Sequence, residues 1–196
     1  MGPIVIRRGL DPRDADAAAA LYWQAFGPKL GRLLGPEPRA RAYLIRAMRP
    51  DHVFTAHAPQ GALVGIAGFR TTVGAFAIGR PLDLVAIYGW PGAVWRVGAL
   101  RLVRQDIAPD RFRIDGLAVG QDQRGQGIGS QLLVAVMEEA ARQGYDRINL
   151  DVVTGNTRAR ALYERHGFAA LGESRPGPLG PLLGFHRATR MECRLG

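Results

Sequence analysis

The sequence predicts a single-domain mixed α/β fold in which helices flank a sheet. The chain has 196 residues, an ordinary length for one domain, and 47% of them are hydrophobic, which is enough to form a core. Strand patterns alternate with helix patterns over residues 114–168. A hairpin pattern precedes them at residues 52–71. Since no repeat or linker is evident, we treat residues 1–196 as one domain.

Composition narrows the setting in which the protein works. Cys193 is the only cysteine, so an internal disulfide is excluded and a reducing, cytoplasmic location is expected. The first fourteen residues lack the apolar region of a signal peptide. The formal net charge is +9, but the arginines are spread along the chain. We therefore expect no nucleic-acid partner, and we expect the positive charge to attract a small anionic ligand instead.

The first part of the chain predicts two helices and three strands. Asp11 or Asp14 can cap the first helix, and the second helix stops before Pro50. Glycines and prolines predict a loop between the two helices, with a short helical turn inside it. The expected elements are a strand at residues 4–8, a helix at 15–26, a loop at 27–36, a helix at 38–48, and hairpin strands at 52–58 and 62–71.

Residues 72–111 form an insertion-like segment of about forty residues before the next strand. Its apolar part, residues 82–102, is long enough to suggest a membrane span. The charged residues Asp83, Arg96 and Arg101 and several glycines argue against a span, so we expect no membrane partner. We expect an inserted helix that packs on the sheet and forms either a wall of the ligand pocket or the surface of a homodimer.

A glycine-rich loop lies between a strand at residues 114–119 and a helix that begins near residue 128. A helix N-terminus presents unpaired N–H groups and partial positive charge. Glycines ahead of it, here Gly125, Gly127 and Gly129, let a ligand approach the backbone. Arg124 adds a full charge at the rim. The loop through Ser130 therefore predicts a site for the phosphate or pyrophosphate of a cofactor.

Two familiar phosphate loops fit this stretch poorly. A P-loop needs a lysine after its last glycine, and the only lysine of the chain is Lys29. A dinucleotide fingerprint matches Gly125, Gly127 and Ser130 imperfectly, with Asp151 roughly where a ribose-binding acid would be. Five residues separate the strand from the first loop glycine, and this gap argues against a dinucleotide site.

Three motifs in order resemble the GNAT superfamily of N-acyltransferases. They are Leu117-Ala118-Val119, then Arg124-x-x-Gly127-x-Gly129, then Asn156-x-x-Ala159-x-x-x-Tyr163-x-x-x-Gly167-Phe168. The resemblance implies a mostly antiparallel sheet that splays beside the strand at residues 114–119. It also implies acetyl-CoA as the acetyl donor and a primary amine, on a small molecule or a protein, as the acceptor. In this family the segment before the central strand often sets acceptor specificity.

The resemblance also implies where the cofactor binds. The strand amides of Leu117 and Val119 would bind the pantetheine arm and polarise the thioester carbonyl. The loop would hold the pyrophosphate through Arg124, Gly125, Gly127, Gly129 and Ser130. Asn156 can cap the last helix, and a hydrogen bond to the cofactor is its added role.

Two residues are candidates for proton transfer. The resemblance makes Tyr163 the general acid, and a phenol with its pKa near 10 is protonated at neutral pH. Tyr163 shares a helix face with Ala159 and Leu162, so a core position is the competing interpretation. Asp115 is the candidate base, and alternation predicts that it shares a strand face with Leu117. Its competing interpretation is an ion pair with an arginine.

The sequence as a whole predicts an acetyl-CoA-dependent N-acetyltransferase that works by direct attack of the amine in a ternary complex. The histidines are not spaced like a metal site, so no metal is expected. Two alternatives stay open. One is a non-catalytic acyl-CoA sensor, and the other is an acyltransferase for longer acyl-CoA, with residues 90–102 lining an acyl or acceptor tunnel.

Overall fold

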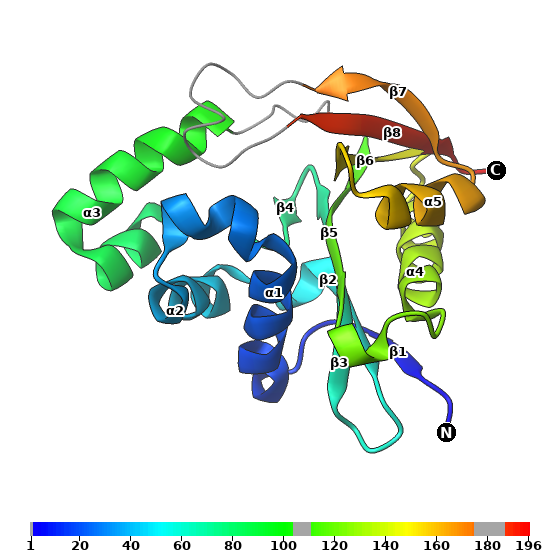
Figure 1. The fold of residues 1–196 in the computed structure, drawn as a ribbon, viewed down its shortest axis with the longest axis horizontal. Helices are drawn as coiled ribbons and strands as arrows, with labels where there is room; N and C mark the ends of the chain where they lie inside the picture. The colour runs from blue at the N-terminus through cyan, green and yellow to red at the C-terminus, as the bar shows by residue number, and fades with distance from the viewer. Residues whose placement is uncertain (1, 104–110, 175–186) are drawn as a thin grey trace.

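A computed structural model describes residues 2–103, 111–174 and 187–196. These residues form an eight-stranded sheet in the order β1-β2-β3-β5-β6-β8-β7, with β4 paired to β3 (Figure 1). Only β5 and β6 pair in parallel, so the prediction of a mixed, mostly antiparallel sheet is confirmed. The strands are β1 (Val5–Arg8), β2 (Val53–His57), β3 (Leu63–Thr71), β4 (Gly74–Ala75), β5 (Phe112–Val119), β6 (Arg147–Val153), β7 (Ala169–Ser174) and β8 (Ala188–Arg194).

Helices cover both faces of this sheet. In Figure 1, α4 and α5 lie on one side of β5, and α1 and α2 lie on the other. The α helices are α1 (Ala15–Leu34), α2 (Glu37–Ala47), α3 (Pro81–Val103), α4 (Ile128–Arg142) and α5 (Thr157–Arg165). Short 3₁₀ turns precede α1, β2 and α4, at η1 (Pro12–Asp14), η2 (Pro50–His52) and η3 (Gln121–Gln123).

Strand alternation divides the core between the two faces. Phe69 and Phe112 stack with ring centroids 4.9 Å apart on the face covered by α4, where Leu132 and Leu133 pack against them. The opposite face buries Ile66 and other apolar side chains against α1. Side chains of the central strands therefore point alternately toward α4 and toward α1, and we call these two faces of the sheet the α4 face and the α1 face.

The central strands β5 and β6 part soon after they meet. Their parallel pairing consists of Phe112 with Ile148 and Arg113 with Asn149. Beyond Arg113, β5 continues along β3, whereas β6 continues along β8. This divergence is the splay that the resemblance to the GNAT superfamily implies. It opens the sheet toward the N-terminal end of α4.

Helix α1 is longer than predicted. It runs through Gly27 and Pro28 to Leu34, although these residues favour a loop after residue 26. Leu33 and Leu34 are buried against α2 and α3, and Gly27 allows close contact with the ring of Trp23, because a Cβ there would lie 3.0 Å from it. Packing of the last turns thus outweighs the hydrogen bond that a proline removes.

The insertion-like segment forms α3, but α3 does not pack on the sheet as predicted. Its buried residues Leu84 and Tyr88 cluster with α1 and α2, and the Tyr88 hydroxyl donates to the carbonyl of Leu34. The helix changes direction at Gly89, whose φ is 70°. Trp90 just beyond this bend is 69% exposed. Among the described helices, none is long and apolar enough to cross a membrane.

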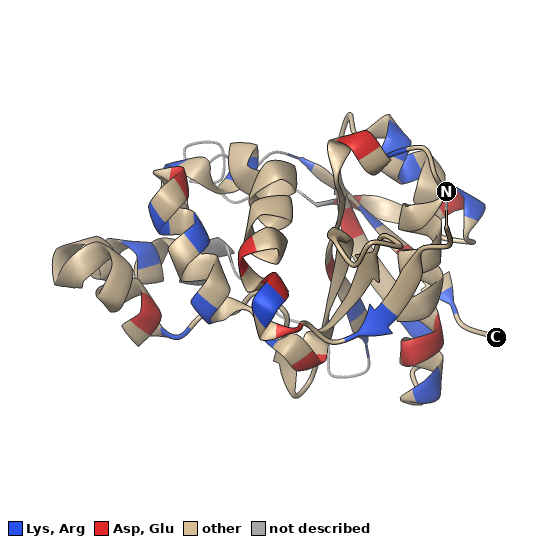
Figure 2. Cartoon of the chain, turned by 90° about the horizontal axis from the view of Figure 1, so that it is seen from below, with Lys and Arg blue, Asp and Glu red and all other residues tan. Residues whose placement is uncertain are grey.

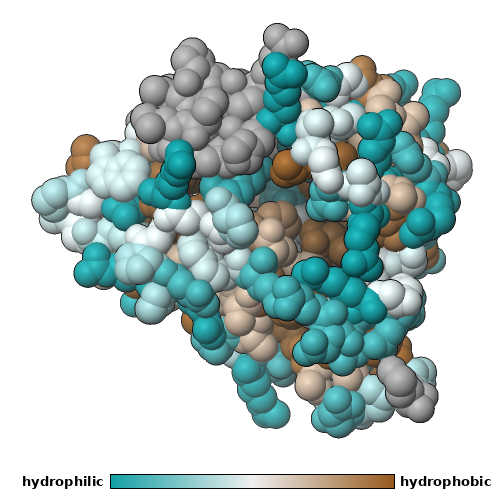
Figure 3. Space-filling view, viewed as in Figure 1, coloured by the Kyte–Doolittle hydropathy of each residue, from teal (hydrophilic) through white to brown (hydrophobic). Residues whose placement is uncertain are grey.

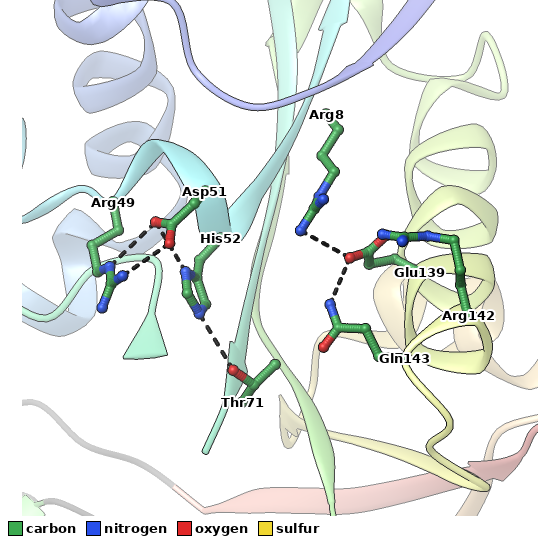
Figure 4. Close-up of polar contacts among 8 residues, drawn as sticks. All are labelled: Arg8, Arg49, Asp51, His52, Thr71, Glu139, Arg142 and Gln143. Atoms are coloured by element: carbon green, nitrogen blue, oxygen red, sulfur yellow. Dashed lines mark hydrogen bonds and ion pairs between the residues drawn. The ribbon is translucent and has the colours of Figure 1, made fainter. Parts of the chain in front are cut away.

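A buried carboxylate ties β1 to α4 (Figure 4). The side chain of Glu139 is only 3% exposed, and it accepts hydrogen bonds from Arg142 and Gln143. Arg8 of β1 reaches it at 3.0 Å. Burial alone would raise the pKa of Glu139, but these donors and charges prevail and lower it.

We predict that Glu139→Gln lowers the free energy of unfolding by about 1.5–3 kcal/mol at neutral pH, because hydrogen bonds to a charge are lost. The folded pKa is depressed, so this contribution is present above the unfolded pKa and is lost as pH falls through the folded pKa. Urea unfolding at neutral pH and at about pH 4 measures the difference, which should narrow in acid. Glu164→Gln, which removes an exposed partner of Arg160, is the control with a small effect. Equal losses of unfolding free energy in Glu139→Gln and Glu164→Gln would contradict the prediction.

Candidate functional site

The glycine-rich loop has the geometry that an anion site requires. Gly125 and Gly127 have φ of 83° and 76°, and a Cβ at either would meet no protein atom within 4 Å. Gly127 is the N-cap of α4 and supplies no capping side chain. The first-turn N–H groups of Ile128, Gly129 and Ser130 therefore point from the helix end toward open space. The loop residues 124–127 are exposed, so a ligand can reach these groups.

Arg124 holds the loop against the end of β5. Its Nε donates to the carbonyl of Val119 at 3.2 Å. The side-chain amide of Gln126 donates to the carbonyl of Asp122 at 3.4 Å. The loop conformation is thus fixed from within, and the guanidinium of Arg124 stays at its exposed rim.

The gap between β5 and β6 beyond Arg113, called the split from here on, is bordered by backbone groups of β5. The N–H of Gly120 donates to Val64 of β3 at 2.9 Å. Because backbone groups alternate along a strand, those of Ala118 also face β3, and those of Leu117 and Val119 face away from it. The recorded pairing of β6 with β5 lies earlier in the strand, so these two N–H groups point into the split. The Leu117 and Val119 side chains pack on the α4 side of the core.

Helix α5 closes the other side of the split. Asn156 caps it, since its Oδ1 accepts from the N–H of Ala159 at 3.1 Å. A Cβ at Gly129 would lie 3.4 Å from Leu162 and 3.6 Å from Leu117, so α4 begins between α5 and β5. In Figure 3 this face of the molecule is hollowed between the α1 side and the α4–α5 side, with hydrophobic side chains in the hollow.

Tyr163 lies on the α4 side of the split. It is 8% exposed and belongs to the same core cluster as Phe168, with ring centroids 5.8 Å apart. Burial raises the pKa of Tyr163 to about 12. The phenol is therefore protonated at neutral pH and can act only as a proton donor there.

Asp115 lies on the opposite face from Leu117, so the prediction of a shared face was wrong. The register of β3 and β5 shifts between Gly68 and Phe69, and this bulge leaves Asp115 without a partner residue across the ladder. Ile114 and Leu117 both face α4, whereas Asp115 pairs with Arg70 on the α1 face, with Arg70 Nε 2.9 Å from Asp115 Oδ1. Its side chain is 7% exposed. Burial raises the pKa of Asp115, although the charge of Arg70 opposes this.

The α1 face carries further charges that the sequence analysis missed. Arg113 of β5 lies 2.7 Å from Asp151 of β6, directly where the two strands part. Arg190 of β8 lies 3.6 Å from the other oxygen of Asp151. Burial lowers the pKa of nearby Lys29, and the charge of Asp151 opposes this. The sequence does carry a signal for these charges, because Arg113 and Asp115 alternate with apolar neighbours in one strand.

The structure also bears on three other features considered in the sequence: a dinucleotide site, the spread of positive charge and a metal site. Asp151 pairs with Arg113 rather than with the glycine-rich loop, which removes the acid that a dinucleotide site would need. Figure 2 shows the Lys and Arg residues interspersed with acidic ones rather than gathered in one stripe. Among the described residues, no three His, Cys, Asp or Glu side chains are placed to hold a metal ion. Residues 175–181 are rich in proline and glycine, which predicts a loop beside the acceptor site, but they lie outside the described residues.

Several curated relatives share part of the chain. N-acetyltransferase 8B of Homo sapiens is 35% identical over 81 residues, which cover 41% of this chain and 36% of that protein. The L-methionine sulfoximine/L-methionine sulfone acetyltransferase of Pseudomonas paraeruginosa is 40% identical over 110 residues, which cover 47% of this chain and 64% of the relative. A mycothiol acetyltransferase of Jonesia denitrificans is 46% identical over 55 residues, 28% of this chain and 18% of that protein. The chain thus spans less than two thirds of the length of each.

Solved structures and a family model extend over more of the chain. A histone acetyltransferase HPA2 and related acetyltransferase from Corynebacterium glutamicum has a TM-score of 0.65 at 21% identity, covering 100% of this chain and 98% of its own. The ribosomal-protein-S18-alanine N-acetyltransferase from Escherichia coli has a TM-score of 0.59 at 18% identity, covering 99% of this chain and 95% of its own. These two likenesses support the fold alone. The model of the acetyltransferase (GNAT) family matches residues 16–168, which include the split, the glycine-rich loop and Tyr163. The chain belongs to the GNAT family of acetyltransferases.

Proposed function

We propose that the protein transfers an acetyl group from acetyl-CoA to a primary amine by direct attack in a ternary complex. The observation that carries this proposal is the meeting of two unsatisfied backbone surfaces. One is the uncapped start of α4, and the other is the inner edge of β5 beyond Arg113. An anionic head and an extended polar arm on one ligand would satisfy both surfaces.

The described residues fit acetyl-CoA. The N–H groups of Ile128, Gly129 and Ser130, with Arg124 at the rim, would hold the pyrophosphate. The amides of Leu117 and Val119 would bind the pantetheine arm. Asn156 would keep its capping role and offer its amide nitrogen to the ligand. When bound, acetyl-CoA supplies a thioester carbonyl as the acyl donor.

Proton transfer would use one group on each face of the sheet beside the split. Asp115 on the α1 face would accept the proton that the amine loses as its nitrogen bonds to the acyl carbon. Tyr163 on the α4 face would donate its phenol proton to the sulfur as the C–S bond breaks. The N–H groups of Leu117 and Val119 would stabilise the charge that develops on the carbonyl oxygen. The acid and the base thus act on opposite ends of the reacting group.

The acceptor would reach the carbonyl from the α1 face. Arg70, Asp115, Arg113 and Asp151 give this face paired charges rather than an apolar wall. Such a lining suits a polar amine, and the Pseudomonas relative is named for small polar substrates of this kind. Small molecules with a primary amine are therefore the first acceptors to screen, with peptide amines second.

We predict that Gly127→Ala weakens acetyl-CoA binding about 10-fold or more, because the added Cβ points into the open space that the phosphates would occupy. Gly144→Ala is the matched control, since Gly144 also has a positive φ, 81°, and a Cβ there meets no atom within 4 Å. Backbone strain is then similar in both variants. Calorimetric titration with acetyl-CoA, and with NADH as a control ligand, measures the effect. Unchanged affinity in Gly127→Ala, or binding of NADH alone, would refute the phosphate-loop assignment.

We predict that Tyr163→Phe lowers kcat by about 100-fold to 10,000-fold with an amine substrate, because the leaving sulfur loses its proton donor. Acetyl-CoA affinity should change little, since the phenol oxygen is not assigned to binding. Release of the CoA thiol measures turnover. Tyr145→Phe removes another hydroxyl, from a ring packed edge-on against Phe112, and should retain activity. Full turnover in Tyr163→Phe would show that this residue is a core aromatic and not the acid.

We predict that Asp115→Asn lowers kcat/KM by about 100-fold or more and removes the acidic limb of its pH profile. Burial raises the pKa of Asp115, so wild-type activity should fall as pH drops through that raised value, where the base becomes protonated. Asp151→Asn breaks a comparable ion pair, with Arg113, and serves as the control. It should keep the acidic limb. If both variants keep that limb, Asp115 is only a partner of Arg70.

A further inference from the structure

The outer side of α3 carries an apolar surface that the proposed acyl transfer does not use. In Figure 1, α3 forms the end of the molecule farthest from α4 and α5. Leu82, Trp90 and Val94 are 71%, 69% and 65% exposed, and Trp95 is 44% exposed. A surface helix normally turns polar side chains outward, and a contiguous exposed apolar patch marks a contact with a partner. All the exposed residues between 81 and 98 are apolar or glycine, and we call them the outer face of α3: Pro81, Leu82, Ala86, Gly89, Trp90, Pro91, Val94, Trp95 and Gly98.

The inner side of α3 is already occupied. Leu84 and Ala93 are each 2% exposed and belong to the cluster that α3 shares with α1 and α2. Arg96 is the only charged residue among residues 84–100, and it donates to the carbonyl of Leu33 at 2.8 Å. Its guanidinium carbon lies 3.8 Å from the ring centroid of Tyr88. The helix is thus apolar on both sides, as a helix buried on both sides would be, but the described residues cover only one of them.

Positive charge predominates beside this helix. Residues 37–47 and 80–100 contain five arginines and two acidic residues, and both acids are engaged. Glu37 lies 3.9 Å from Arg41, and Asp83 accepts from the backbone N–H of Arg80 at 2.8 Å. In Figure 2 the end of the molecule formed by α2 and α3 accordingly shows more blue than red.

Three of these arginines, Arg39, Arg46 and Arg80, are exposed, and no ion pair is recorded for them in the part of the chain that the structure describes. Burial lowers the pKa of Arg96 and the charge of Arg39 adds to this effect, so Arg39 lies beside α3. Arg46 follows Arg39 by seven residues, which puts both on one face of α2. Arg80 directly precedes α3. The outer face of α3 is therefore flanked by uncommitted cations.

A second copy of the chain fits this face poorly. A two-fold interface brings each surface against its own equivalent, so Arg39, Arg46 and Arg80 would meet the same cations of the other copy. Like charges opposite one another across an interface oppose association, and the net charge of +9 adds to the repulsion. An anionic surface instead gains from these charges. Tryptophan side chains also favour the boundary between lipid headgroups and acyl chains.

We propose that α3 seats its outer face on the surface of a lipid bilayer that contains anionic phospholipids. Leu82, Trp90 and Val94 enter the boundary between headgroups and acyl chains, and the flanking arginines contact the lipid phosphates. The charges that argue against a membrane span, Asp83 and Arg96, do not oppose this contact, because neither belongs to the outer face. The contact does not depend on the proposed acyl transfer.

Co-sedimentation of the full chain with lipid vesicles tests the proposal. We expect binding to vesicles of phosphatidylcholine mixed with phosphatidylglycerol, and weaker binding to phosphatidylcholine alone. Binding should weaken as salt is added, because ions screen the attraction between exposed charges. The fluorescence of Trp90 and Trp95 should shift to shorter wavelength as their rings leave water. Absence of binding to the anionic vesicles overturns the proposal.

Serine substitutions locate the apolar contact. Leu82→Ser with Val94→Ser should weaken vesicle binding about 10-fold or more, because both side chains lose their transfer out of water. Val73→Ser with Leu171→Ser is the matched control, since Val73 and Leu171 are 76% and 57% exposed but lie outside α3. Urea unfolding checks that both double variants stay folded. Equal weakening by the two pairs would show that α3 is not the contact.

Arginine substitutions locate the electrostatic contact. Arg39→Gln with Arg46→Gln should weaken binding to the anionic vesicles about 5-fold for each arginine removed. Arg7→Gln with Arg165→Gln, exposed arginines of β1 and α5, should have little effect. Equal weakening by the two pairs would show nonspecific attraction to positive charge and overturn the proposal. Sedimentation velocity supplies a last check, because a dimer that Leu82→Ser with Val94→Ser dissociates, without vesicle binding, would assign the outer face to a second copy instead.

Discussion

The parting of β5 and β6 is the constraint on which the candidate site depends. Each strand is anchored along its outer edge, because β5 pairs with β3 from Arg113 to Val119 and β6 pairs with β8 over its whole length. Their inner edges can therefore diverge without loss of either outer ladder. Divergence leaves the N–H groups of Leu117 and Val119 without a partner strand, and such groups need another partner. The uncapped start of α4 lies at the same opening, so a strand edge and a helix end both face one space.

An ion pair marks the point at which the strands separate. Arg113, the last residue of β5 that pairs with β6, lies 2.7 Å from Asp151, which follows the last paired residue of β6 by two positions. Asp115, on the bulge that follows, is held by Arg70 of β3. Breaking a buried pair by removing one partner typically costs about 3–5 kcal/mol, because the other charge stays buried. These pairs therefore hold the charged side chains of the α1 face in place.

The sequence predicted those features that neighbouring residues determine. Gly127 and Asn156 begin helices as expected, since caps and left-handed glycines depend on a few adjacent residues. Distant contacts decided the rest. Helix α1 passes Pro28 because its last turns are buried by α2 and α3, and α3 packs on helices because their surfaces complete its core. The bulge that puts Leu117 on the opposite face from Asp115 depends on the register with β3, which no pattern within β5 encodes. The ion pair of Arg113 with Asp151 depends on the pairing of two strands far apart in sequence.

The same physical cause gives the two candidate proton-transfer groups their different properties. Burial disfavours the charged form of any acid, so it raises the pKa of both Tyr163 and Asp115. For a phenol, the result is a group that keeps its proton at neutral pH. For a carboxylate, the result is a stronger base, and the nearby charge of Arg70 limits the rise in pKa. In the proposed mechanism the separation of these two groups matters, because a proton would be taken on one face of the sheet and given on the other. The proposed direct attack by the amine would therefore need no nucleophilic side chain.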